Sequence, residues 1–232
     1  MLKDSERSLL LYCYHMKLNV PLLQQEADST NCQAVCVQMI LHYYGDMVTI
    51  DEIMAGLEPY IVDGTGMHSE GPPIWLKKRG YDVTFIAHDY DVIDRQIKGV
   101  TDKDVERLEA KLAKITERGD DRDQYRLEKL PLLIELIEVG VSFDSKIPSL
   151  NVIDELLSQK IPVKIGADAR VLRTDPWKTC GHSVVVVGKD GDNYLLNDPS
   201  PYSDGHYSVS PNQLLMAWYM GGARTTVIKP LK

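Results

Sequence analysis

The sequence predicts an α+β fold, with helices in its first half and an antiparallel sheet in its second. Residues 32–44 carry apolar side chains at helical spacing, and the chain after residue 150 contains several apolar runs of strand length. The 232 residues are 44 % hydrophobic and 26 % charged, which is ordinary globular usage and excludes wholesale disorder. We expect one domain spanning residues 1–232.

The first half begins with its clearest element. Asp28-Ser29-Thr30-Asn31 is a run of residues typical of helix N-caps, and Gly45 is a typical helix stop. Small or apolar residues recur at 32, 35, 36, 39, 40 and 43, so a core-facing helix is predicted over 32–44. Further predicted elements are helices over 49–57 and 74–79 and an alternating strand over 81–86.

Residues 89–145 differ in character from the rest of the chain. Residues 102–118 have a narrow apolar stripe in a highly charged background, and 127–139 form a second helical pattern around Pro131. We expect a helical hairpin inserted between core elements. Its favoured role is to cover or restrict a substrate cleft, because inserted helices commonly gate such sites.

The second half predicts a helix followed by strands. His182 opens a valine-rich run that is apolar on both faces, as in a central buried strand. The other predicted elements are a helix over 152–158, strands over 162–167 and 194–197, a helix over 211–220 and a strand over 223–229.

Several functional classes are disfavoured by composition. The net charge of -8 argues against a general nucleic-acid binder, which needs a basic face. No apolar stretch is long enough for a membrane span, and the charged start Met1–Arg7 does not resemble a signal peptide. Four cysteines without a C-x-x-C pair do not make a disulfide scaffold, so a cytoplasmic protein with reduced thiols is expected.

One of these cysteines is placed for nucleophilic chemistry. Cys32 lies in the predicted first helical turn, where the helix N-terminus stabilises a thiolate. A nucleophilic cysteine needs a base, and His182 follows roughly 150 residues later, a separation typical of papain-like enzymes. A two-residue turn after the His182 strand would put Asn197 on the face of His182, whereas a bulge or a longer loop would put Asp198 there.

Two blocks of the sequence, one around Cys32 and one around His182, together resemble the bacteriocin-processing, double-glycine leader branch of the papain-like cysteine peptidases. The first block is Val20-Pro21-Leu22-Leu23-Gln24-Gln25, then Cys32, then an apolar helix ending in Tyr43-Tyr44-Gly45. The second is Pro162-Val163, then Gly181-His182 before the valine run, then Asn197-Asp198-Pro199. The similarity covers most of residues 18–87 and 147–230. It implies a papain-like fold, a helical half packed on an antiparallel sheet.

The resemblance also implies residue roles. Cys32 would be the nucleophile, His182 the general base and then acid, and Asp198 the residue that orients His182. Gln25 would donate its amide to the oxyanion, with Gln24 as the competing candidate because the spacing to Cys32 is about one residue longer than usual. Gln33 stands where the family has glycine.

The sequence therefore predicts a cysteine-dependent hydrolase that cleaves a peptide or isopeptide bond of a peptide or protein substrate, without a metal or organic cofactor. Transglutaminase, amidase or deamidase chemistry would use the same thioester. An inactive peptide-binding module is another alternative. A zinc site built from Cys32, Cys36, Cys180 and His182 is a rival reading, although its spacing is not a standard one.

Overall fold

The computed structural model describes residues 15–62, 66–88, 102–119, 123–146, 149–172 and 181–230. Within these residues, eight strands form one sheet, in the order β5-β4-β10-β6-β7-β8-β9, with β1 pairing β7 as well. The strands are β1 (His15–Lys17), β4 (Asp82–Ala87), β5 (Ser142–Ser145), β6 (Val163–Asp168), β7 (Gly181–Asp190), β8 (Asn193–Asn197), β9 (His206–Val209) and β10 (Thr225–Lys229). All neighbours pair antiparallel except β4 and β5, which are parallel.

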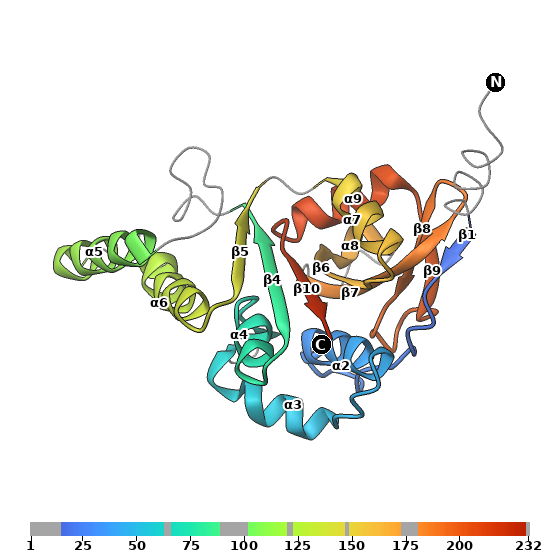
Figure 1. Ribbon diagram of the computed structural model, residues 1–232, viewed down its shortest axis with the longest axis horizontal. Coiled ribbons are helices and arrows are strands. Elements are labelled where there is room, and N and C mark those ends of the chain that lie inside the picture. Colours follow the sequence, from blue (N-terminus) through green and yellow to red (C-terminus); the bar gives the residue numbers. More distant parts are fainter. Residues whose placement is uncertain are drawn as a thin grey trace.

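Helices lie on both sides of this sheet (Figure 1). They are α2 (Cys32–Tyr43), α3 (Ile50–Leu57), α4 (Gly71–Lys78), α5 (Asp102–Arg118), α6 (Gln124–Glu138), α7 (Leu150–Ser158), α8 (Ala169–Leu172) and α9 (Pro211–Met220), with a short 3-10 turn at Glu58–Tyr60. A small hairpin pairs β2 (Ile61–Val62) with β3 (Gly66–Met67). In the view of Figure 1, α2 and α3 lie below the sheet, and α7, α8 and α9 lie above it. The prediction of an α+β fold, with helices packed on a mostly antiparallel sheet, is confirmed.

The core forms where α2 packs against β7. The buried side of α2 includes Val37, Met39 and Ile40, and the valines of β7 are fully buried. Burial of an aliphatic side chain contributes about 1.5–3 kcal/mol, so this contact is a main source of stability. It fixes the start of α2 beside the start of β7, which brings residues 32 and 182 together.

A β-bulge interrupts β7 where the register shifts between Val186 and Gly188. At Gly188 the backbone of β1 comes very close, because a Cβ atom there would lie 1.9 Å from the carbonyl oxygen of Met16. Glycine is therefore required where β1, β7 and β8 meet. The bulge also sets which residues of β8 share a face with His182.

Residues 102–138 form a helical hairpin beyond the β5 edge of the sheet (Figure 1). The helices α5 and α6 pack on each other through Leu108, Ile115, Leu130 and Leu133, which are almost fully buried. The α6 helix of this hairpin contacts α4 in the rest of the molecule. We call it the α5–α6 hairpin.

Some element boundaries differ from the sequence-based expectation. Residues 142–145, at the end of the expected helical insertion, form β5, which belongs to the main sheet. The helix expected over 74–79 begins at Gly71, because prolines are tolerated in a first helical turn. The helix expected from 127 begins at Gln124 and continues through Pro131.

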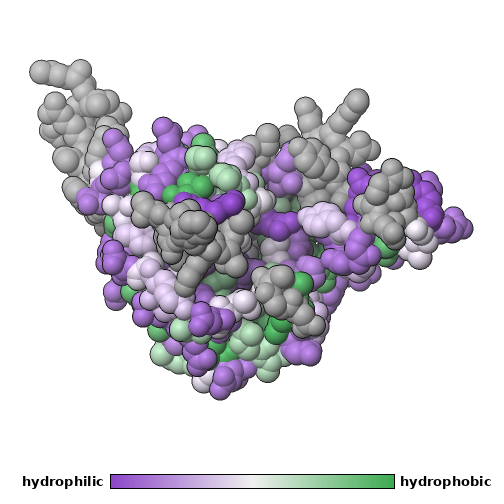
Figure 2. Space-filling model, turned by 180° about the vertical axis from the view of Figure 1, so that it is seen from behind, coloured by the Kyte–Doolittle hydropathy of each residue, from purple (hydrophilic) through white to green (hydrophobic). Residues whose placement is uncertain are grey.

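Figure 2 shows the molecule from the side opposite to that of Figure 1. On this face the described residues are mostly hydrophilic, with small separate hydrophobic patches. Within the part of the chain that the structure describes, no helix combines the length and the apolar character that crossing a membrane requires.

Candidate active site

Cys32 is the first residue of α2. The capping residue Asn31 makes no side-chain hydrogen bond to the helix, and its Oδ1 instead accepts from the Ser29 hydroxyl at 2.7 Å. The first turn therefore keeps its backbone N–H groups free of a side-chain cap, and they face the position where negative charge on Cys32 would develop. The helix begins where the run of capping residues predicted it, but Asn31 does not cap it. The uncapped N–H groups can instead stabilise negative charge on Cys32.

His182 lies in the second position of β7, and its partner is Asp198. His182 Nε2 lies 2.6 Å from Asp198 Oδ1, and the Asp198 side chain is fully buried. The bulge in β7 explains this pairing, because it shifts the β8 register by one residue and puts Asp198 on the face of His182. Asn197, the alternative partner, points elsewhere and donates to the Val20 carbonyl at 3.0 Å.

Asp198 is held as a carboxylate by further donors. Its Oδ1 accepts from the Ser200 backbone N–H at 2.8 Å, and its Oδ2 accepts from the Tyr207 hydroxyl at 2.8 Å. A buried carboxylate is costly unless it is hydrogen-bonded, and these donors meet that need. They also leave the carboxylate little freedom to turn away from His182.

Cys32 and His182 interact, and each shifts the pKa of the other. Burial raises the pKa of the Cys32 thiol, but the hydrogen bond and the charge of His182, together with the Lys164 ammonium, outweigh it, so the pKa lies below its ordinary value of 9.0. Burial lowers the pKa of His182, yet hydrogen bonds to Asp198 and Cys32 raise it to about 9. These opposite shifts favour a thiolate–imidazolium pair near neutral pH.

Gln25 lies beside Cys32 in the wall of the pocket, whereas Gln24 is exposed and outside it. The Gln25 backbone N–H donates to the Pro199 carbonyl at 2.8 Å, which ties the arm before α2 to the segment that carries Asp198. The Gln25 amide nitrogen donates to the Ser29 carbonyl at 2.7 Å. One of its two N–H bonds is thus engaged, and its buried Oε1 has no hydrogen-bond partner among the described residues.

Gln33 and Lys164 are site residues that sequence reasoning did not assign. Lys164, on β6, is 3 % exposed, and its ammonium donates to Gln33 Oε1 at 3.1 Å. Gln33 in turn donates to the Met67 carbonyl at 2.8 Å. The Gln33 side chain therefore bridges the sheet and the β2–β3 hairpin beside Cys32. The signal for Lys164 was a single charge inside the apolar run 162–167.

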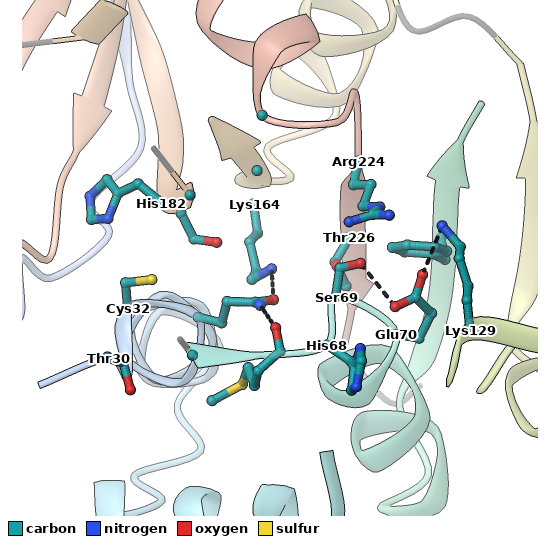
Figure 3. A pocket seen from close by; sticks show the side chains of 18 of the residues that line it. Thr30, Cys32, His68, Ser69, Glu70, Lys129, Lys164, His182, Arg224 and Thr226 are labelled. Carbon is teal, nitrogen blue, oxygen red and sulfur yellow. Dashed lines mark hydrogen bonds and ion pairs between the residues drawn. The ribbon is translucent and has the colours of Figure 1, made fainter. Parts of the chain in front are cut away.

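These residues line a pocket of about 310 Å³ (Figure 3). Cys32 and His182 lie at one end, Lys164 lies between them and Arg224, and Glu70 and Lys129 lie at the other end. Residues of α6 form part of that far wall; they are Tyr125, Glu128 and Lys129. The α5–α6 hairpin thus contributes directly to the pocket.

Of the other three cysteines, the structure describes Cys36 alone, so the alternative zinc site that includes Cys180 is not tested. Cys36 is fully buried one turn after Cys32, and burial raises its pKa well above 9.0, which makes it a core residue with an unreactive thiol. Cys13 and Cys180 lie outside the described residues. Among the residues that are described, no cluster of three or more histidine, cysteine or acidic side chains could hold a metal ion.

Comparisons with known proteins find likeness only at the level of structure. No protein-family model and no curated protein matches the sequence. The peptidase domain of Streptococcus ComA, a bi-functional ABC transporter involved in a quorum-sensing pathway, aligns with a TM-score of 0.50 and 14 % identity, over 94 % of this chain and 100 % of that domain.

Two further solved structures align over 94 % of this chain. One is a double-glycine motif protease from an AMS/PCAT transporter in complex with the leader peptide, with a TM-score of 0.47, 13 % identity and 96 % of its own length. The other, from Bacillus anthracis, is described as a C39-like peptidase, with a TM-score of 0.47, 15 % identity and 98 % of its length. The chain has the fold of the peptidase domain of Streptococcus ComA.

Proposed function

We propose that the protein is a cysteine peptidase that uses Cys32 as nucleophile, His182 as general base and acid, and Asp198 as the residue that orients His182. The observation that carries the proposal is the arrangement at one end of the pocket, where Cys32 and His182 interact and His182 Nε2 lies 2.6 Å from Oδ1 of a fully buried Asp198. Nucleophile, base and orienting group in this order are what acyl transfer through a thioester requires.

In the proposed reaction, each step belongs to one group. The Cys32 thiolate attacks the carbonyl carbon of the scissile bond, and the resulting oxyanion lies at the start of α2, near the Cys32 backbone N–H and the free N–H of Gln25. The His182 imidazolium gives its proton to the leaving amine, which leaves a thioester on Cys32. His182, now neutral, then takes a proton from water as the water attacks the thioester and releases the acid.

The lining of the pocket favours an extended substrate. Its wall is shared by α2, the main sheet and α6, and we infer that an extended chain binds between the α5–α6 hairpin and Cys32. A peptide or a flexible protein segment fits this description better than a folded protein surface. We assign to the hairpin the role of limiting which chains reach Cys32.

Intact-mass labelling with a peptide-derived electrophile tests the proposal. The wild type should gain one adduct at Cys32 near neutral pH. The adduct should be absent in Cys32→Ala and strongly slowed in His182→Ala. Cys36→Ala is the matched control, since it removes a neighbouring thiol of the same helix without touching the proposed site, and its labelling should equal that of the wild type.

The outcome separates an enzyme from a binding module. Equal and slow labelling of Cys32 and of an unfolded reference thiol would show that the pair is not activated and would overturn the proposal. If Cys32 is activated, mass spectrometry of incubated peptide libraries then distinguishes hydrolysis from transfer to an added amine, because the two products of the same thioester differ in mass.

A further inference from the structure

A buried cation in the pocket has no acidic partner at bonding distance. Lys164 is 3 % exposed, and Gln33 Oε1 is the acceptor of its ammonium among the described residues. An ammonium has three N–H donors, so two of them lack a protein acceptor in that part of the chain. Burying such a charge is costly unless something else satisfies it, and burial indeed lowers the pKa of Lys164.

A second cation stands next to it on the same face of the sheet. Lys164 pairs with Thr226 across β6 and β10, and Arg224 precedes Thr226 by two residues, so both cations project to the same side. Between them, opposite Arg224, stands Gly166, whose N–H donates to the Arg224 carbonyl at 2.9 Å. Gly166 lines the pocket, and a Cβ atom there would lie 3.1 Å from the Gly221 carbonyl oxygen, so this position leaves no room for a side chain beside the two cations.

Two carboxylates line the same pocket, Glu70 and Glu128. The Gln124 amide donates to Glu128 at 2.7 Å, and Glu70 acts on the Lys164 ammonium through its charge. Glu70 accepts from the Ser69 hydroxyl at 3.0 Å, and its Oε1 lies 3.6 Å from the Lys129 ammonium. The Arg224 guanidinium donates to the Tyr125 hydroxyl at 3.2 Å, and no ion pair joins Lys164 or Arg224 to a carboxylate within the described ranges. The middle of the pocket is therefore locally basic in a chain whose net charge is -8.

We propose that Lys164 and Arg224 form a carboxylate-binding subsite next to Cys32, so that the preferred substrate carries a carboxylate close to the bond that is attacked. The proposal rests on the proposed peptidase function and names its substrate class. The carboxylate would accept from the two N–H donors of Lys164 that lack a protein acceptor and from the guanidinium of Arg224. Its source is either an aspartate or glutamate side chain or the free C-terminus of a short peptide.

A pair of alkylating reagents of nearly equal size measures this preference at Cys32 itself. Iodoacetate carries a carboxylate and iodoacetamide does not, and in both cases the thiolate sulfur forms the new S–C bond as iodide leaves. Peptide mapping gives the rate at Cys32 for each reagent, and the ratio is compared with that of glutathione. We expect the iodoacetate-to-iodoacetamide ratio to exceed that of glutathione by about tenfold or more, as a charge-assisted hydrogen bond predicts.

Three variants show where the preference comes from. Lys164→Met keeps the length and buried character of the side chain but removes its charge, and the ratio should fall to about the glutathione value. Arg224 is half-buried, so Arg224→Gln should not disturb folding as a core substitution can. It should lower the iodoacetate-to-iodoacetamide ratio. Lys189→Met is the control for net charge, because Lys189 pairs with Asp154 at 3.0 Å away from the pocket, and its ratio should stay that of the wild type.

The two proposals fail in different ways. If Lys164→Met slows both reagents equally and leaves the ratio unchanged, Lys164 only stabilises the thiolate and the subsite is refuted. If Cys32 reacts slowly with both reagents in the wild type while the ratio still depends on Lys164, the peptidase proposal fails and the anion site stands.

Protection experiments identify the source of the carboxylate. N-acetyl-aspartate amide is compared with N-acetyl-asparagine amide, and glycylglycine with glycylglycine amide, as protectors of Cys32 against iodoacetamide. Stronger protection by the first acid indicates a side-chain carboxylate, and stronger protection by the second indicates a C-terminus. If neither acid protects better than its own amide, the carboxylate subsite is refuted.

Discussion

Replacing Asp198 by asparagine removes a charge but keeps a side chain of the same shape. The asparagine carbonyl can still accept from His182 and from the Ser200 N–H, and its amide can donate to the Tyr207 oxygen, so the hydrogen-bond pattern survives. What is lost is the anion that stabilises the imidazolium in a buried position. The substitution therefore tests electrostatics rather than packing.

The magnitude follows from the acidity of His182. Burial alone lowers its pKa, and Asp198 is the main contributor among the groups that raise it to about 9. In Asp198→Asn we expect the pKa to fall from about 9 toward its ordinary 6.5, because Cys32 remains to raise it in part. At about 1.4 kcal/mol per pKa unit, a full return to 6.5 would remove about 3.5 kcal/mol of stabilisation of the charged ring, or about 300-fold in its protonation equilibrium, and this is the upper limit of the expected effect.

A direct titration measures this shift. The histidine ring signals are followed by NMR against pH, and His182 is assigned from the signal missing in His182→Gln. The wild-type ring should stay protonated through neutral pH and lose its proton near 9, whereas the variant should lose it at a lower pH, closer to 6.5. Cys32 alkylation at neutral pH should slow in parallel, because the thiolate loses its charged partner.

Tyr207→Phe is the matched control, since it removes a donor to Asp198 but leaves the carboxylate. Its His182 pKa should stay well above 7. If Asp198→Asn leaves the titration of His182 unchanged, the assignment of Asp198 as the stabilising anion is refuted.

Further predictions concern stability and reactivity elsewhere. Gly188→Ala should lower the free energy of unfolding by about 1–3 kcal/mol in urea titrations, because its Cβ would meet the Met16 carbonyl; an unchanged midpoint would show that β1 yields freely. Thr49→Ala should cost about 1 kcal/mol in the same assay, because Thr49 and Glu52 form a reciprocal capping box at α3; Thr49→Ser should recover most of it. Cys36 should resist alkylation in the folded protein and react on unfolding, as its burial and raised pKa require; labelling of native Cys36 as fast as Cys32 would contradict this.

Most of the fold could be predicted from the periodicity of apolar residues. The start of α2 and the central strand β7 were predictable because their apolar residues pack on each other and leave a regular pattern. The start of α4 was not predictable from periodicity, because its first turn contains Pro72 and Pro73 and shows no apolar pattern of helical spacing. Residues 142–145 gave no signal of joining the sheet, since a four-residue edge strand is too short for a period to show.

The site was partly readable from sequence. The spacing of Cys32 and His182 pointed to two elements that the core then brings together. The choice between Asn197 and Asp198 was open, because it depends on the bulge in β7, which no local pattern marks. Lys164 was missed because a lone lysine in a strand is usually interpreted as an exposed position, and only the three-dimensional packing shows that it is buried.

The bulge between Val186 and Gly188 determines which residue of β8 lies beside His182. The choice depends on whether the number of residues between His182 and the turn is even or odd. Side chains alternate between faces, so one residue more or less in β7 exchanges the carboxylate of Asp198 for the amide of Asn197 without any substitution in the site. A single-codon deletion at Val187 would thus convert a Cys–His–Asp series into a Cys–His–Asn one. Relatives that differ by one residue in this strand should be aligned by their bulge before their catalytic residues are compared.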